Sequence, residues 1–172
     1  MSLTFSKLFN YIAPASLFLY IYRDNFVFKI VPMLNPDGVI VGNYRCNLAG
    51  VDLNRTWDTP SRKLNPTIFY LKQMIRRFMD DRELILFCDL HGHSRKMNVF
   101  MYGCENKKTW SLRLRERVFP RMLWRNAKVF SFSDCTFKVS KQKENAGRVV
   151  VWRELGLTNS YTMEASFCGA DF

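Results

Sequence analysis

The sequence predicts an α/β fold, in which helices pack on a mixed central sheet. Short β-branched and aromatic runs alternate along the chain with segments whose apolar residues recur at helical spacing. One of these runs, Leu84–Asp89, is almost continuously apolar, as expected of a central strand that is covered on both faces. The 172 residues are 48% hydrophobic and 15% aromatic, which suits one folded domain with a buried core and excludes a disordered chain.

Four segments organise the first half of the chain. Phe26–Val31 is predicted as a strand that ends at Pro32, and Asn35–Gly38 carries the residues of a tight turn. Scattered Gly, Asn and Pro over 39–66 predict a long working loop. Thr67–Met79 is predicted as an amphipathic helix.

The second half adds further strands and a basic helix. After Leu84–Asp89 we expect strands at Asn98–Tyr102, Val149–Trp152 and Ser160–Ala165. Residues 107–127 are predicted as a basic amphipathic helix that is kinked or divided at Pro120.

The segment Leu8–Tyr22 is mostly apolar but matches neither a signal peptide nor a membrane span. Its densest apolar run follows the small residues around Pro14 instead of preceding a cleavage site. At about fifteen residues it is also too short to cross a bilayer. We expect a buried helix or strand there, and no membrane partner.

The net charge indicates which classes of partner the protein favours, and the cysteines indicate its cellular compartment. The chain has 26 Lys and Arg against 15 Asp and Glu, a net charge of +11, which favours acidic partners. Composition alone leaves nucleic acid, an anionic membrane and an acidic polypeptide open, but no nucleic-acid motif accompanies the charge. Five cysteines without a Cys-x-x-Cys pair indicate reduced thiols of a cytosolic protein.

His91 follows the buried run and is a candidate metal ligand. Asp89 precedes it by two residues, so both side chains are expected on one side of the strand, where the carboxylate can orient the imidazole. His93 shares the same alternation and is the rival candidate. A hydrogen-bonded structural histidine is the alternative for either residue.

Glu164 is the candidate proton-transferring residue. A glutamate within an apolar strand is costly to bury without a partner. It either pairs with Arg153 or Arg148 or accepts a proton from a bound water and returns it to a leaving amine.

Asn54 and Arg55 are candidates for binding a carboxylate. The planar guanidinium pairs with a carboxylate through two hydrogen bonds, and the amide adds a neutral donor beside it. Arg45, on the same predicted loop, is a second cation for charge that develops on a carbonyl oxygen.

Several long motifs occur in the order found in a known family. They are Asn35–Cys46 (NPDGVIVGNYRC), Asp52–Arg55 (DLNR), Cys88–Lys96 (CDLHGHSRK), Asn98–Cys104 (NVFMYGC) and Tyr161–Phe167 (YTMEASF). With these motifs the chain resembles the cytosolic carboxypeptidases, the M14-type zinc metallocarboxypeptidases that trim glutamates from tubulin. The resemblance covers residues 26–172 as part of a catalytic domain, and residues 1–25 match less clearly.

The resemblance implies a fold, a cofactor and a role for each site residue. The fold would be an α/β/α sandwich on a mixed central β-sheet of eight strands, with one Zn²⁺. His91 would bind zinc, Glu164 would be the general base and acid, and Arg45 would stabilise the oxyanion. Asn54 and Arg55 would hold the terminal carboxylate of the substrate, with Arg148 as a candidate for contacting the side chain of a substrate glutamate.

One family feature is missing from this sequence. The family's other two zinc ligands lie in a His-x-x-Glu motif before the Asn35–Gly38 segment, yet no histidine or glutamate precedes Asn35. The chain is therefore interpreted as an N-terminally truncated catalytic domain, as a short isoform without zinc, or as one part of a site that a second polypeptide completes.

Two functions follow from these observations. The first is zinc-dependent removal of C-terminal or branch-point glutamates from polyglutamylated proteins such as tubulin, in the cytoplasm and in association with microtubules or cilia. The alternative is a catalytically inactive fragment or isoform that binds acidic, glutamate-rich protein tails without hydrolysis. Nucleic-acid binding rests on charge alone and ranks last.

Overall fold

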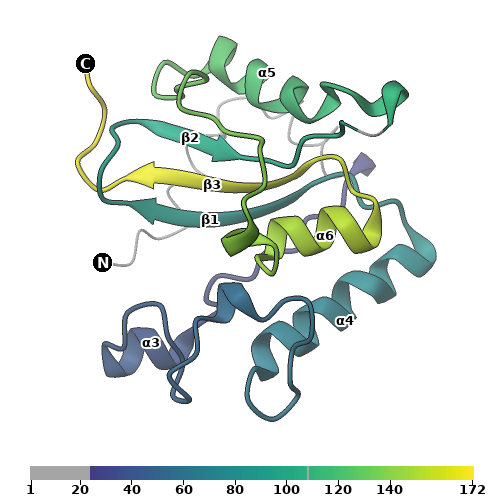
Figure 1. The fold of residues 1–172 in the computed structure, drawn as a ribbon, viewed down its shortest axis with the longest axis vertical. Coiled ribbons are helices and arrows are strands. Elements are labelled where there is room, and N and C mark those ends of the chain that lie inside the picture. Colours follow the sequence, from purple (N-terminus) through teal and green to yellow (C-terminus); the bar gives the residue numbers. More distant parts are fainter. Residues whose placement is uncertain (1–23, 108) are drawn as a thin grey trace.

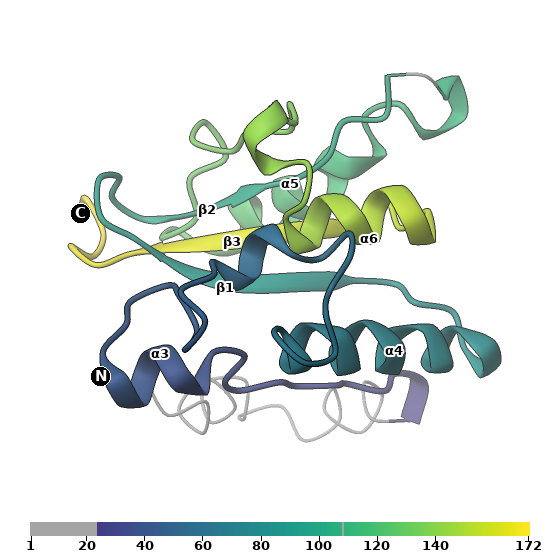
Figure 2. The same ribbon diagram turned by 60° about the horizontal axis from the view of Figure 1, so that its bottom comes forward.

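Helices lie on both sides of a mixed sheet in the computed structural model, which describes residues 24–107 and 109–172 (Figure 1). Helix α5 (Val118–Asn126) and helix α6 (Gly147–Leu155) lie on opposite sides of the sheet. Helix α4 (Pro66–Asp81) runs beside strand β1 (Phe87–His93) (Figure 2). The predicted α/β/α sandwich is thereby confirmed.

Three strands form the described sheet, in the order β1-β3-β2. Strand β3 (Ser160–Ser166) is central; it pairs parallel with β1 and antiparallel with β2 (Val99–Tyr102). The sheet is therefore mixed, as predicted. Because side chains alternate along a strand, Asp89, His91 and His93 share one face of β1, and Cys88 and Leu90 share the other.

A separate apolar core packs on each side of the sheet. The face of the sheet that carries Phe87 packs against α4 and α6. Its core consists of Trp57, Ile68, Ile75, Val150 and Val151, with Phe87 packed against them. On the other face, Met101 and Tyr161 pack with residues of α5 and the loop that follows it.

Buried Lys72 fastens helix α4 to the loop before it and to α6. Its Nζ donates to the carbonyl oxygens of Trp57 at 2.7 Å and Asp58 at 3.0 Å, and it lies 2.9 Å from Oε2 of Glu154. A buried ammonium group is tolerated only when it is paired in this way. These contacts hold the loop that carries the candidate carboxylate-binding residues.

Two predicted strands are wrong. Phe26–Val31 is exposed and unassigned, because β-propensity yields a strand only where a neighbouring strand and a packed face are present. Val149–Trp152 lies inside helix α6. This short apolar run is buried on several sides, so its pattern does not distinguish a strand from a buried helix.

Other predicted elements are present with shifted bounds. The predicted Leu84–Asp89 strand begins at Phe87 and continues to His93, so His91 lies inside it. The Asn35–Gly38 turn is the start of helix α3 (Pro36–Val41), where the Asn35 side chain accepts from the Gly38 N–H at 3.1 Å. The predicted basic helix consists of 3₁₀ turns at Trp110–Leu112 and Arg115–Arg117 followed by α5. Pro120 sits in the first turn of α5, a position that needs no N–H donor, so it causes no kink.

The remaining short elements are 3₁₀ turns at Leu53–Arg55 and Lys141–Lys143. Among the described residues, no helix has the length and apolar character that crossing a bilayer requires. The expectation for Leu8–Tyr22 lies outside the described residues.

Candidate active site

The register of the sheet places His91 beside Glu164. In the parallel pair of β1 and β3, His91 is the direct partner of Glu164, and Asp89 is the partner of Thr162. Partners in a ladder project to the same side of a sheet. An imidazole and a carboxylate from segments far apart in the sequence therefore face the same space.

A hydrogen-bond chain orients the His91 ring. Oδ2 of Asp89 lies 2.7 Å from Nε2 of His91 and accepts a bond of 3.3 Å from Nδ2 of Asn54. Donation from Nε2 leaves Nδ1 as the nitrogen that can bind a metal ion. Asp89 thus has the predicted geometry of an orienting carboxylate.

The environment shifts the pKa of both central residues. Burial acts to lower the pKa of His91, but the hydrogen bond and negative charge of Asp89, with the charge of Glu164, outweigh it, so the pKa is raised. Burial raises the pKa of Glu164, although His91 and His93 oppose this shift. Within the described residues Glu164 forms no ion pair, so the alternative of structural pairing with Arg153 or Arg148 is not observed.

Asp52 forms ion pairs with the two arginines of the loop. Arg45 Nε lies 2.9 Å from Oδ2 of Asp52, and Arg55 Nη1 lies 3.9 Å from the same oxygen. Arg55 also donates to the carbonyl oxygen of Asn54 at 2.7 Å. Both guanidinium groups remain partly exposed, so both are accessible to an anion.

Asn54 connects the loop to the start of helix α6. Its Oδ1 accepts from the Gly147 N–H at 2.8 Å while its Nδ2 faces Asp89. A side chain at position 147 would approach the buried Trp57 indole to 2.8 Å, so the helix can reach this position only with glycine. The amide that was predicted to bind substrate is thus already hydrogen-bonded within the protein.

Arg148 lies in helix α6 and is buried. Its Nη1 lies 3.5 Å from Oγ1 of Thr162, its guanidinium faces the Tyr102 ring at 5.6 Å, and its Nε has no hydrogen-bond partner among the described residues. Burial lowers its pKa, although an arginine stays charged in proteins. A buried guanidinium with an unused donor fits an anion that enters from the Glu164 side.

Lys143 was missed by the sequence analysis. It precedes α6 and is half-buried; burial, followed by the positive charges of Arg55, Arg45 and Arg148, lowers its pKa. The three arginines therefore lie close enough to Lys143 to disfavour its charged form. Nothing in the sequence distinguishes Lys143 from the other 25 lysines and arginines, because its position depends on the turn before α6.

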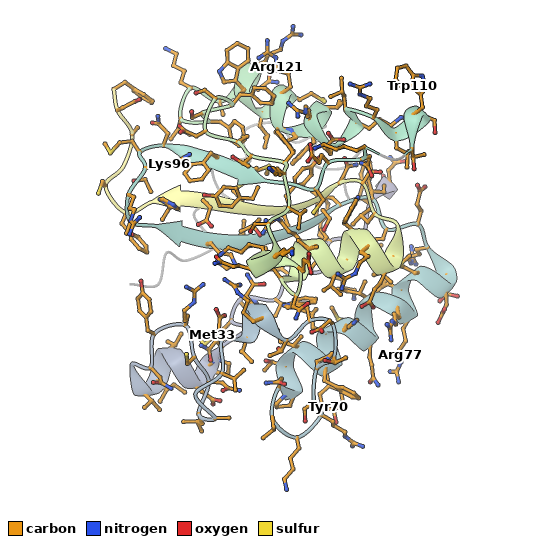
Figure 3. All side chains as sticks on the ribbon, in the orientation of Figure 1. Met33, Tyr70, Arg77, Lys96, Trp110 and Arg121 are labelled. Carbon is orange, nitrogen blue, oxygen red and sulfur yellow. The ribbon has the colours of Figure 1, made fainter. Side chains whose placement is uncertain are left out.

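His93, the rival ligand, has a structural role. Its Nδ1 accepts from the backbone N–H groups of Arg95 at 3.2 Å and Lys96 at 3.0 Å, and its ring meets the edge of Phe100. Lys96 lies at the carboxyl ends of β1 and β3 (Figure 3). This histidine stabilises the turn after β1.

The described residues do not by themselves form a zinc site. A catalytic zinc ion takes three protein ligands and a water. No group of three His, Cys, Asp or Glu side chains with metal-binding geometry occurs within 24–107 and 109–172. His91 as a ligand stays a prediction, and its expected companions are not found among these residues.

The sequence and fold were compared with those of known proteins. The family model for zinc carboxypeptidase, Peptidase_M14, matches residues 20–172. The chain belongs to the M14 zinc carboxypeptidase family. Within this family it is 57% identical over 152 residues to cytosolic carboxypeptidase 3 of Mus musculus, covering 86% of this chain and 15% of the mouse protein. It is 59% identical over 151 residues to cytosolic carboxypeptidase 2 of Homo sapiens, covering 86% of this chain and 16% of that protein.

Solved M14-type structures show the same fold. A metallo-carboxypeptidase from Burkholderia cenocepacia matches with a TM-score of 0.69 and 25% identity, over 80% of this chain and 35% of that one. A metallo-carboxypeptidase from Pseudomonas aeruginosa, in complex with (2-guanidinoethylmercapto)succinic acid, matches with a TM-score of 0.67 and 30% identity, over 80% and 36%. This chain therefore spans about one sixth of the length of the two cytosolic carboxypeptidases and about a third of these bacterial M14 chains.

Proposed function

We propose that this chain forms the substrate-binding and proton-transferring part of a metallocarboxypeptidase site. The observation that carries the proposal is the pairing of His91 with Glu164 across β1 and β3, beside a loop that presents Arg45 and Arg55. Family membership supports a hydrolase that removes C-terminal residues.

Each residue has a role that matches its position. Arg55 would bind the terminal carboxylate of a peptide, with Asn54 contributing when its amide turns from Asp89 to the substrate. Arg45 would stabilise negative charge on the scissile carbonyl oxygen. Glu164, whose pKa is raised by burial, would hold and release the proton that the departing amine needs.

The cations indicate an acidic substrate. Arg148 and the two loop arginines lie close enough to Lys143 to act on its charge, so a side-chain carboxylate next to the terminal one would be favoured. We therefore propose C-terminal or branch-point glutamates of polyglutamylated proteins such as tubulin as substrates, in the cytoplasm and near microtubules or cilia.

Zn²⁺ is the proposed cofactor, with His91 as one ligand. Since the described residues supply no second and third ligand, a non-hydrolytic function is the second candidate for this chain. In that case the same cations would bind glutamate-rich tails without releasing glutamate.

Peptide binding tests the recognition site. A dye-labelled peptide that ends in several glutamates should bind at least about tenfold more tightly than the same peptide with an amidated C-terminus, since one charge-assisted pair is worth about 1.4 kcal/mol or more. Arg55→Gln should abolish this preference, whereas Arg77→Gln, exposed near the end of helix α4, should preserve it. Equal affinity for the acid and the amide would contradict the proposal.

Metal content and turnover separate the two candidate functions. Zinc is measured by elemental analysis after dialysis, with His91→Ala as the control, and glutamate release is measured beside Glu164→Gln. Stoichiometric zinc that is lost in His91→Ala, with release abolished in Glu164→Gln, would establish an enzyme. Binding of the acid peptide without zinc or release would establish the non-hydrolytic alternative.

A further inference from the structure

A second surface feature lies at the opposite end of the sheet from His91 and Glu164. A groove of about 860 Å³ runs between the end of α4, the end of α6 and the start of α5. Its lining includes Ile85, which precedes β1, and Asn159, which precedes β3. His91 lies six residues beyond Ile85, so the groove and the candidate site are about 20 Å apart along the strand.

The lining combines polar residues with apolar side chains that are unusually exposed. Ile85 is 48% exposed, Val118 is 55% exposed and Met122 is 58% exposed, while Phe119 and Leu155 lie deeper. The i,i+4 spacing of Val118 and Met122 places both on one side of α5. Exposed apolar groups that gather in a groove mark a binding surface more often than scattered ones do.

The rim and the neighbouring helix are cationic. Arg82 and Arg115 line the groove, and neither forms an ion pair within the described part of the chain; Glu83 is the acidic residue of the lining. Residues 109–128 carry six Lys and Arg against the single, buried Glu116. Trp110 lies in a 3₁₀ turn before α5, and Arg121 lies in α5 itself (Figure 3).

We propose that this groove binds an acidic amphipathic segment of a partner protein. Apolar side chains of the segment would fill the groove between Ile85, Val118 and Met122, and its carboxylates would meet Arg82 and Arg115. Burial of apolar area would supply most of the affinity, and charge complementarity would set orientation and selectivity. Such a partner would be held away from the candidate active site and would leave it open.

Other occupants match this surface less well. A bilayer is flat and cannot reach the floor of a groove, and the lining offers nucleic-acid bases a single, partly buried aromatic ring, that of Phe119. A second copy of a chain with net charge +11 would be repelled by the cationic rim. Residues 1–23 contain no acidic side chain, so they lack the complementary charge.

The test uses the full chain and a defined probe. The probe is a dye-labelled synthetic peptide of about eighteen residues, with leucines at i, i+3, i+4 and i+7 and glutamate elsewhere. Fluorescence anisotropy should show at least about tenfold tighter binding than for a peptide of the same composition with scrambled leucines. Unlabelled oligoglutamate of equal charge should compete poorly.

Three variants locate the binding surface. Val118→Asp and Arg115→Glu should each weaken binding about fivefold or more. Lys63→Glu, an equal charge reversal on an exposed turn at the other end of α4, should change binding less than about twofold. Because Val118 and Arg115 are exposed, all three variants should keep the circular dichroism spectrum of the parent.

Several outcomes would overturn the proposal. Equal weakening by Lys63→Glu, or full competition by oligoglutamate, would show binding through general charge or through the candidate active site. Binding to vesicles of about one-third phosphatidylserine that Val118→Asp abolishes, without peptide binding, would identify a membrane surface. A dimer in light scattering that Val118→Asp dissociates would identify a second copy as the occupant.

Discussion

At the scale of single residues, the candidate site depends on one amide. Asn54 uses Oδ1 to accept from the helix α6 backbone and Nδ2 to donate to Asp89, which in turn fixes the His91 ring. The sequence predicts Asn54 as a donor to substrate, because an Asn-Arg pair suits a carboxylate. It does not reveal the bond to Gly147, because that contact joins residues 93 positions apart.

Removing this amide should destabilise the protein. Asn54→Ala leaves the Gly147 N–H without its acceptor and removes one donor from Asp89, so we expect a loss of about 1–3 kcal/mol in the free energy of unfolding. Urea unfolding followed by circular dichroism measures it. The control is Asn126→Ala, whose exposed side chain donates to the Met122 carbonyl and whose loss should cost less than about 0.5 kcal/mol. Equal effects of the two substitutions would contradict this role of Asn54.

At the scale of secondary-structure elements, the sequence predicts those with a clear period and fails where burial overrides propensity. Helix α4 is recognisable from its apolar spacing, and β2 and β3 from their β-branched and aromatic runs. Val149–Trp152 has the composition of a strand, yet it lies in a helix whose boundary signals, Gly147 and Gly156, fall outside the run. Gly156 has a φ of 69°, which ends the helix in the left-handed region.

Substitution by alanine should have effects of different size at two glycines, Gly147 and Gly92. Gly147→Ala should lower the free energy of unfolding by about 1–3 kcal/mol, because the new Cβ would meet the buried Trp57 indole, which has no room to move. Gly92→Ala should cost less than about 1 kcal/mol, although its Cβ would meet the Phe167 ring, because that ring is 72% exposed and can swing away. Thermal or urea unfolding of both variants distinguishes them. The reverse order would show that α6 is seated differently.

The ion pair between Lys96, in the turn after β1, and Asp134, in the loop after α5, should stabilise the protein near neutral pH and lose this effect in acid. The Ser131 hydroxyl and then Lys96 lower the pKa of Asp134 by hydrogen bonding to its carboxylate. Because the folded pKa lies below the unfolded value of about 3.8, the stabilisation is present above that pH and is lost as the pH falls through the folded pKa. Asp134→Asn should therefore lower the free energy of unfolding by about 0.2–1 kcal/mol at about pH 5, a range typical of exposed ion pairs. At about pH 3 the substitution should lower it by less.

Urea unfolding at the two pH values measures this difference. Asp171→Asn, which removes an exposed carboxylate with no ion pair among the described residues, is the control and should show no such convergence. A constant deficit of Asp134→Asn at both pH values would show that its carboxylate is stabilised no more in the folded chain than in the unfolded one.

At the scale of the whole molecule, the sheet brings together what the sequence leaves separate. The motifs predict that His91 and Glu164 belong to one site, and a parallel register places them side by side. The proximity of Arg45, Arg55 and Arg148 to Lys143 needs the packing of a loop, a turn and a helix, which no local pattern encodes. The roles of these residues in catalysis and the chain's partners stay predictions.

The cysteines report on the packing of two apolar clusters, since Cys88 packs against Met101 and Tyr161, and Cys104 packs with Ala146 and Val149. Burial raises the pKa of Cys88 and of Cys104 to about 12, and the charge of Asp89 adds to the shift at Cys88, so both thiols stay protonated at neutral pH. Cys168 is exposed. Timed alkylation with iodoacetamide, followed by peptide mass spectrometry, should modify Cys168 first and Cys88 and Cys104 only on unfolding. Modification of Cys88 or Cys104 as fast as Cys168 would contradict the described packing.

The bond between Asn54 and Gly147 also sets when the site can form during folding. It closes a loop of 93 residues, and the chain must lose the conformational entropy of that loop before the bond can form. The turns of α4 involve residues close in sequence, so they can form earlier. Helical signal should therefore return early in a refolding experiment, and the capacity to bind a carboxylate should return last. A nascent chain emerging from the ribosome would expose Asn54 and Arg55 long before helix α6, to which Asn54 is hydrogen-bonded, has been synthesised.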